Sequence, residues 1–149
     1  MRALVQRVSS ACVTVDDRVV GRIAGGFVVL LGVTHTDSEE EAEWLARKVA
    51  GLRVFDDADD KMNASLSDVD GELLVVSQFT LYGDARKGRR PSYTKAALPE
   101  QAEPLVDYFV EQLRGLGYNV ATGIFGANMD VEIHNDGQVT LMVEREAPQ

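Results

Sequence analysis

A short apolar run at residues 73–76 ends abruptly in polar side chains, and this feature most constrains how the chain can fold. Four apolar residues in a row are typical of a strand buried in the middle of a core. The next residues, Ser77-Gln78-Phe79-Thr80, carry two hydroxyls and an amide around one aromatic ring. Such polar groups cost free energy to bury without partners, so this strand end should face a cleft, a partner or a ligand.

The remaining pattern predicts a single α+β domain over residues 1–149. β-branched residues predict strands at 4–8, 12–15, 19–23 and 27–33, and further strands are expected at 53–55, 72–80, 119–122, 129–134 and 139–143. Ser38 and Glu41 have capping-box spacing and open one amphipathic helix, while a second helix begins near Pro99. We therefore expect mostly antiparallel, barrel-like β-sheets with two main helices packed on one sheet face.

Composition limits the cellular setting. The longest apolar stretch, residues 27–33, has strand length and is too short to cross a membrane, and no secretory signal is visible. Cys12 is the only cysteine, which excludes an internal disulfide and fits a reducing cytoplasm. We expect a cytoplasmic protein in which Cys12 is a small core hydrophobe, with a reactive thiol as the alternative.

The charge distribution is uneven. A net charge of −9 argues against promiscuous binding to polyanions, and no DNA partner is expected. A compact basic run nevertheless lies inside a long connection at residues 83–98, and it consists of Arg86, Lys87, Arg89 and Arg90. This run predicts either a surface that holds RNA or an ordinary solvated loop.

Several familiar catalytic arrangements are missing from the sequence. There is no nucleophile elbow and no glycine-rich phosphate loop. His35 and His134 lie in separate elements without metal-ligand spacing, so we expect no metal and no cofactor. A triad of Ser77, His134 and an aspartate remains a minor alternative. Asp136-Gly137 lies between two alternating segments and is typical of a β-hairpin turn.

Several stretches nevertheless match, in order, the motifs of one family. Residues 77–81 read Ser-Gln-Phe-Thr-Leu, and residues 135–140 fit Asn-x-Gly-Pro-x-Thr except that Gln138 replaces proline. Residues 122–129 fit a third pattern, with Asn128 where aspartate is usual, and residues 6–8, 13–15, 55–56, 61–63 and 90–92 also agree. Over almost its whole length the chain thus resembles the D-aminoacyl-tRNA deacylases, long called D-tyrosyl-tRNA deacylases.

The resemblance implies a tRNA-editing hydrolase without a cofactor. Such an enzyme cleaves the ester of D-aminoacyl-tRNA, and of glycyl-tRNA mischarged on tRNA(Ala), while excluding L-aminoacyl-tRNA by steric clash. Its partner is the 3′ end and acceptor stem of aminoacylated tRNA, and its active site lies at the subunit interface of a homodimer. The implied catalytic residues are Ser77, Gln78, Phe79 and Thr80; the implied substrate-binding residues are Phe125, Ala127, Met129, Gly137, Gln138, Val139 and Thr140; and the implied tRNA-binding residues are Arg86, Lys87, Arg89 and Arg90.

Two mechanisms remain open at this point. An aminoacyl ester is already activated, so positioning and oxyanion stabilisation by backbone N–H groups around Gln78 and Phe79 can suffice. In the family, the vicinal ribose hydroxyl is thought to help activate water. The rival mechanism uses Thr80 as a nucleophile, although the sequence offers it no obvious neighbouring base.

Gln138 is the main departure from the family pattern. The family's turn contains a cis Gly-Pro bond whose carbonyls hold the α-amino group of the substrate. A cis bond costs about 0.5–1 kcal/mol before proline and about 2.5–4 kcal/mol before another residue, so we favour a trans Gly137–Gln138 bond. Alternatives are therefore a non-catalytic or chirally relaxed RNA-binding dimer and, more remotely, a small-ester hydrolase using Ser77 or Thr80.

Overall fold

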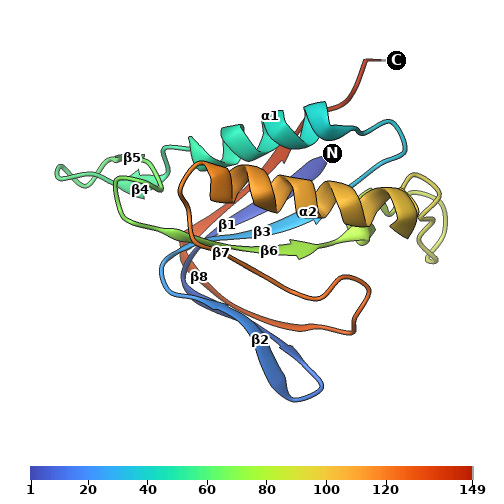
Figure 1. Ribbon diagram of the computed structural model, residues 1–149, viewed down its shortest axis with the longest axis horizontal. Helices are drawn as coiled ribbons and strands as arrows, with labels where there is room; N and C mark the ends of the chain where they lie inside the picture. Colours follow the sequence, from blue (N-terminus) through green and yellow to red (C-terminus); the bar gives the residue numbers. More distant parts are fainter. Residues whose placement is uncertain (149) are drawn as a thin grey trace.

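The computed structural model describes residues 1–148 and arranges them as one large curled sheet, covered on one face by two helices, and a separate two-stranded sheet (Figure 1). The strands are β1 (Arg2–Val15), β2 (Arg18–Ile23), β3 (Gly26–Gly32), β4 (Phe55–Asp56), β5 (Met62–Ala64), β6 (Glu72–Ser77), β7 (Val120–Thr122) and β8 (Asp130–Glu144). The helices are α1 (Glu39–Ala50) and α2 (Pro99–Gly115), and a single 3-10 turn, η1, spans Phe79–Tyr82.

The main sheet is mixed. Its order is β2-β1-β3-β6-β7, and β8 pairs with β1. The three ladders that β1 makes with β2, β3 and β8 are antiparallel, whereas β6 runs parallel to both of its neighbours, β3 and β7. The expected α+β fold with a largely antiparallel, barrel-like sheet is therefore confirmed, but the strand that carries the first motif belongs to its parallel part.

The sheet curls because β1 is long and changes partners along its length. Residues 2–8 of β1 pair with β3, and residues 11–15 pair with β2. This brings β2 round towards β7, where a side chain at Gly21 would collide with the carbonyl of Thr122. Glycine at this position allows the two backbones to approach closely and nearly closes a barrel.

Both helices pack on the same face of the sheet, as predicted (Figure 1). Helix α1 is capped at its start by Ser38, whose backbone N–H donates to the Glu41 carboxylate at 2.8 Å in a complete capping box. The main core fills the space between the helices and the sheet, with Phe27, Leu45 and Phe109 fully buried. Within residues 1–148, neither helix is long and apolar enough to cross a lipid bilayer.

A second, smaller core fills the curled half of the sheet and includes Val13, Val28 and Leu74. Strand β3 therefore has apolar neighbours on both faces, and β6 is buried along its central four residues. Cys12 belongs to neither core, because it lies half-buried between two inward-facing neighbours on β1. The expectation that Cys12 is a core hydrophobe is wrong, since the two-residue period of the strand turns its side chain outward.

Candidate active site

The end of β6 forms the centre of the candidate site. The strand stops at Ser77, three residues earlier than predicted, because Gln78 leaves the extended conformation and the chain turns into η1. The N–H of Gln78 still donates to the Leu31 carbonyl of β3 at 2.8 Å. Arg2 fixes the far end of η1, since its guanidinium donates to the Leu81 carbonyl at 2.8 Å and lies over the Tyr82 ring.

Two backbone donors at the start of η1 are free. Within residues 1–148, no hydrogen-bond acceptor contacts the N–H of Phe79 or of Thr80, as expected for the first turn of a helix. The Gln78 N–H, in contrast, is occupied by Leu31 and cannot serve as a donor to a ligand. The available pair of donors is thus Phe79 and Thr80, one residue further along than the sequence suggested.

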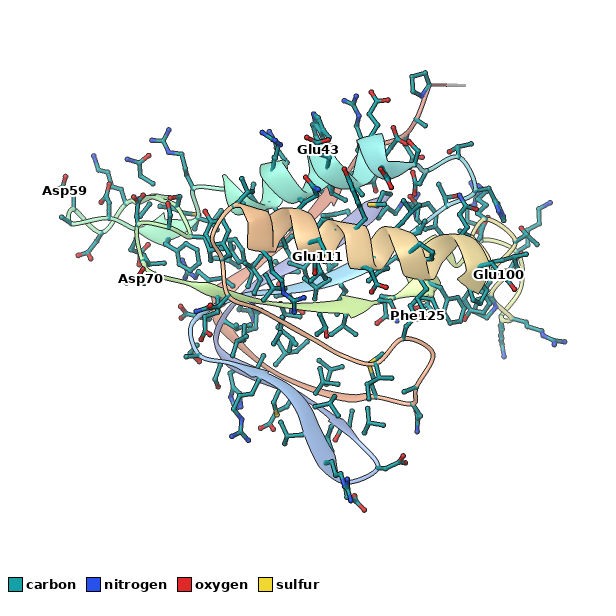
Figure 2. The ribbon with its side chains drawn as sticks, in the orientation of Figure 1. Glu43, Asp59, Asp70, Glu100, Glu111 and Phe125 are labelled. Atoms are coloured by element: carbon teal, nitrogen blue, oxygen red, sulfur yellow. The ribbon has the colours of Figure 1, made fainter. Side chains whose placement is uncertain are left out.

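Phe79, the first of these donors, lines an apolar pocket of about 360 Å³, and Thr80 follows it directly in the chain. Ser77, Gln78 and Phe79 form one wall, residues 96–99 and the first turns of α2 form the opposite wall, and Phe125 with Gly126 forms a third side. Figure 2 shows Phe125 beside the half of α2 that carries Glu100. The pocket therefore offers an apolar floor with unpaired polar hydrogens at its edge.

No strong base lies next to the hydroxyls of this site. The Thr80 hydroxyl accepts a hydrogen bond from the Gln78 side-chain amide at 2.5 Å. Among the described residues, no histidine or carboxylate hydrogen-bonds to Ser77 or Thr80. His134 instead contacts Glu132 on β8, and His35 contacts the Thr94 carbonyl. The structure therefore does not assemble the Ser77–His134 triad considered above.

The third motif, residues 122–129, contributes Phe125 and residues that follow it to the candidate site. Phe125 lines the main pocket and also a small cavity of about 50 Å³ that contains Met129 and Ser77. The Ala127 N–H donates to the Ile124 carbonyl at 3.1 Å and closes a tight turn at this point. The structure thus brings Phe125 and Met129 to the first motif, whereas Ala127 lies in the supporting turn.

The second motif does not form a hairpin, so that expectation is wrong. Residues 130–144 are one strand, β8, which pairs with β1 on both sides of residues 136–139. Asn135 pairs with Val8 and Thr140 pairs with Gln6, so residues 136–139 bulge out opposite Arg7 alone. Antiparallel pairing with one long strand overrides the local turn preference of Asp136-Gly137.

Arg7 and Asn135 hold this bulge. The buried Arg7 guanidinium donates to the carbonyls of Asp136, at 3.3 Å, and Val54, at 2.7 Å. The Asn135 amide donates to the Val139 carbonyl at 3.0 Å and its oxygen accepts from the Thr140 hydroxyl at 3.2 Å. Gly137 has a φ of 97°, which favours glycine, and the Gly137–Gln138 bond is trans, as favoured above.

Gly137 and Gln138 are exposed and do not line the pocket of their own chain. Val139 is half-buried, and the Thr140 hydroxyl is used inside the bulge. The structure therefore separates the two halves of the implied substrate site within one chain.

The basic run lies in a loop whose ends are joined. Asp84 and Ser92 exchange two backbone hydrogen bonds of 2.8 Å. Arg86 binds the Asp84 carboxylate at 2.6 Å, and this guanidinium is the main reason that the pKa of Asp84 lies well below its usual range. Arg86 is therefore engaged within the loop. Lys87, Arg89 and Arg90 are exposed and make no ion pair among the described residues.

Two residues at this site were missed by the sequence analysis. Tyr93 and Leu98 both line the pocket, although 42% and 66% of their surfaces are exposed. Tyr93 could have been identified, because an aromatic residue beside a basic run is a typical feature of RNA-binding surfaces. Leu98 carries no comparable signal.

A separate polar hollow lies on the outer face of β1 and β8. The Cys12 thiol donates to the Glu132 carboxylate at 3.4 Å. Burial and this hydrogen bond raise the pKa of the Cys12 thiol, so the thiolate is disfavoured there. The contact with His134 is the main cause that lowers the pKa of Glu132.

Known proteins resemble this chain over nearly its full length. A D-aminoacyl-tRNA deacylase from Exiguobacterium sp. is 60% identical over 147 residues, covering 99% of this chain and all of that protein. The D-aminoacyl-tRNA deacylase of Symbiobacterium thermophilum is 58% identical over 146 residues, covering 98% and 97% of the two chains.

Two solved structures share the fold. The c-Myc DNA Unwinding Element Binding Protein superposes with a TM-score of 0.93 at 43% identity, covering 99% of this chain and 100% of that one. A probable eukaryotic D-amino acid tRNA deacylase gives a TM-score of 0.82 at 19% identity, covering 95% and 97%. The family model described as D-Tyr-tRNA(Tyr) deacylase matches residues 4–144. The motif-bearing turn at the end of β6, the near-complete coverage and this match together show that the chain belongs to the D-Tyr-tRNA(Tyr) deacylase family.

Proposed function

We propose that this protein is a D-aminoacyl-tRNA deacylase, a hydrolase that releases a free D-amino acid and tRNA from their ester. The observation that carries the proposal is the turn at Phe79 and Thr80, which offers two unpaired N–H donors at the edge of an apolar pocket. This turn occurs in a chain that is 58–60% identical to proteins named for that activity.

The chemistry requires little from side chains. Water adds to the ester carbonyl carbon, and the oxygen that becomes negative accepts hydrogen bonds from the N–H groups of Phe79 and Thr80. The bond to the ribose oxygen then breaks, and that oxygen leaves with a proton. The vicinal ribose hydroxyl orients and activates the water, which agrees with the lack of a base beside Thr80 within residues 1–148.

The pocket and the basic loop suit the 3′ end of a tRNA. The exposed ring of Phe79 provides apolar surface of the kind on which an unstacked base binds. Lys87, Arg89 and Arg90 are free to contact phosphates of the acceptor stem, which positions the RNA without reading its sequence. Arg86 is bound to Asp84 and contributes through the shape of the loop.

Selection of the D-enantiomer needs a second copy of the chain. The Gly137 bulge of one subunit enters the pocket of its partner, where it narrows the space that is left for an L side chain. Three features support this assembly: Gly137 is exposed, the outer edge of β8 has no partner strand within residues 1–148, and Leu141 and Met142 are exposed beside it. Glycyl esters, which have no side chain to exclude, are also substrates.

The direct test is deacylation of three charged tRNAs: D-Tyr-tRNA(Tyr), L-Tyr-tRNA(Tyr) and Gly-tRNA(Ala). We expect release of D-tyrosine and glycine, with L-Tyr-tRNA(Tyr) left intact. Binding of all three without release would contradict the proposed activity, and rapid release of L-tyrosine would contradict the proposed selectivity.

A second comparison tests how the water is activated. Thr80→Ala keeps the backbone donor and removes the hydroxyl, so we expect this variant to retain turnover. A D-Tyr-tRNA whose terminal adenosine lacks the 2′-hydroxyl should instead react much more slowly. Complete loss with Thr80→Ala and normal reaction of the deoxy substrate would identify Thr80 as the nucleophile.

A further inference from the structure

We propose that Tyr93 is a positioning residue that transmits RNA binding at the basic loop to the turn at Phe79 and Thr80. This inference rests on the proposed function and deepens it. Tyr93 lies outside the recognised motifs, and the inference gives it the role of linking the basic loop to the turn at Phe79 and Thr80.

The basic loop meets η1 through a narrow neck. The paired hydrogen bonds between Asp84 and Ser92 close the loop, and the Arg86–Asp84 ion pair stiffens the closure. The two ends of the closed loop are Gly83, directly after η1, and Tyr93. A displacement of the loop is therefore transmitted to η1 through this neck, which consists of the Asp84–Ser92 pair with Gly83 and Tyr93.

Tyr93 fills the space between the neck and the turn. Its ring packs edge-on against Phe79, with 5.2 Å between centroids and 69° between ring planes. It also covers Gly83, where an added Cβ would lie 2.8 Å from Tyr93 Cε1 and 2.9 Å from the Thr80 carbonyl oxygen. The absence of a side chain at Gly83 thus allows the Tyr93 ring to touch both the loop neck and the catalytic turn.

The turn itself has few other restraints on its outer side. Phe79 is 57% exposed, and Tyr93 is the aromatic partner it has among the described residues. The proposed donors are the N–H groups of Phe79 and Thr80, and such donors are effective only when held close to their productive geometry. Phosphates bound at Lys87, Arg89 and Arg90 would restrict the motion of the loop. Through its contact with Phe79, Tyr93 would then restrict the motion of the two N–H donors as well.

The test compares a full substrate with one that cannot reach the basic loop. Single-turnover deacylation is measured at saturating enzyme for D-Tyr-tRNA(Tyr) and for 3′-D-tyrosyl-adenosine, which lacks the acceptor stem. In the wild type we expect the full substrate to react faster. Tyr93→Ala should lower this rate ratio about 3- to 10-fold, as expected for the loss of one aromatic pair, while the dissociation constant of uncharged tRNA changes less than about twofold.

Two further variants control the result. Tyr93→Phe keeps the ring and should retain the wild-type ratio. Tyr93→Leu keeps a large apolar side chain but removes the ring, so it should lower the ratio as Tyr93→Ala does, and it serves if Tyr93→Ala fails to fold.

Equal slowing of both substrates by Tyr93→Ala would overturn the inference, because Tyr93 would then shape the turn without transmitting RNA binding. Weaker tRNA binding with an unchanged saturated rate would also overturn it, because Tyr93 would then be a direct contact. A wild-type protein that releases no D-tyrosine from either substrate would refute the proposed function itself, which is a distinguishable result.

Discussion

At the scale of single residues, neighbouring backbone N–H groups at the end of β6 differ in whether they have a hydrogen-bond partner. The Gln78 N–H completes the ladder with Leu31, and the Gln78 side chain is bound to the Thr80 hydroxyl. The N–H groups of Phe79 and Thr80 come next and have no acceptor within residues 1–148. A change of backbone direction at one residue thus separates donors that stabilise the sheet from donors that can bind a ligand.

Gln138→Pro should sharpen selection for D over L substrates. Proline lowers the free-energy cost of a cis bond after Gly137 by about 2–3 kcal/mol, so the gain is limited to about a hundredfold. The measurement is the ratio of deacylation rates for D-Tyr-tRNA and L-Tyr-tRNA in the two proteins. An unchanged ratio would mean that Gln138 does not influence the rejection of L substrates.

Arg86→Ala should return the pKa of Asp84 upwards towards 3.8, the value of a free carboxyl, because the guanidinium is the main cause of its depression. In the wild type the folded pKa is lowered, so the stabilising pair is present above the unfolded value and is lost only as pH falls through the lower folded value. A ¹³C NMR titration of the Asp84 carboxyl measures this directly. Arg89→Ala is the matched control and should leave the titration unchanged.

At the scale of elements, features set by neighbouring residues could be predicted from the sequence, whereas features set by pairing with distant strands could not. Ser38 and Glu41 are three residues apart and satisfy each other within one turn, so the start of α1 could be predicted from sequence alone. The Asp136-Gly137 turn could not, because β1 lies more than a hundred residues away and pairs with both flanking segments. Pairing that depends on distant strands is invisible in a local pattern.

The same limit applies to the candidate site. Phe79 and Thr80 were identified because their motif follows a buried strand. Tyr93 and Leu98 reach the pocket only because the long connection folds back over η1, where Asp84 and Ser92 join. The contacts that fold this loop leave no periodic pattern in the sequence, so the positions of Tyr93 and Leu98 could not be predicted from it.

Ser38→Ala should destabilise the protein by about 1 kcal/mol, because it removes the side-chain acceptor at the start of α1. The free energy of unfolding in urea measures the change. Lys48→Gln, at an exposed position of the same helix that makes no ion pair among the described residues, is the control and should have a much smaller effect. Equal losses in the two variants would contradict a specific role of the cap.

At the scale of the whole molecule, the separation of the motifs is the main observation. The bulge that contains Gly137 and Gln138 is exposed and lies outside the pocket formed by η1 and the start of α2. One chain therefore presents each half of the proposed site on a different surface. In the proposed assembly, two copies are arranged so that each bulge meets the other's pocket.

Leu141→Glu combined with Met142→Glu should convert a dimer into a folded monomer without deacylase activity, because charged side chains would replace exposed apolar ones along β8. Sedimentation equilibrium measures the mass, and circular dichroism checks the fold. Leu116→Glu makes the same change at a distant leucine of similar exposure and should leave a dimer. A wild-type protein that sediments as a monomer would refute the proposed assembly.

The acidic residues around β4 and β5 and the basic loop lie at opposite ends of the molecule (Figures 1 and 2). Asp56, Asp59 and Asp60 are exposed at one end, and Lys87, Arg89 and Arg90 at the other. A molecule with a net charge of −9 would repel a polyanion from most directions, but this separation gives it a dipole moment. In the proposed complex, the field exerts a torque that turns the basic end towards an approaching tRNA, and this orienting effect strengthens as the salt concentration is lowered.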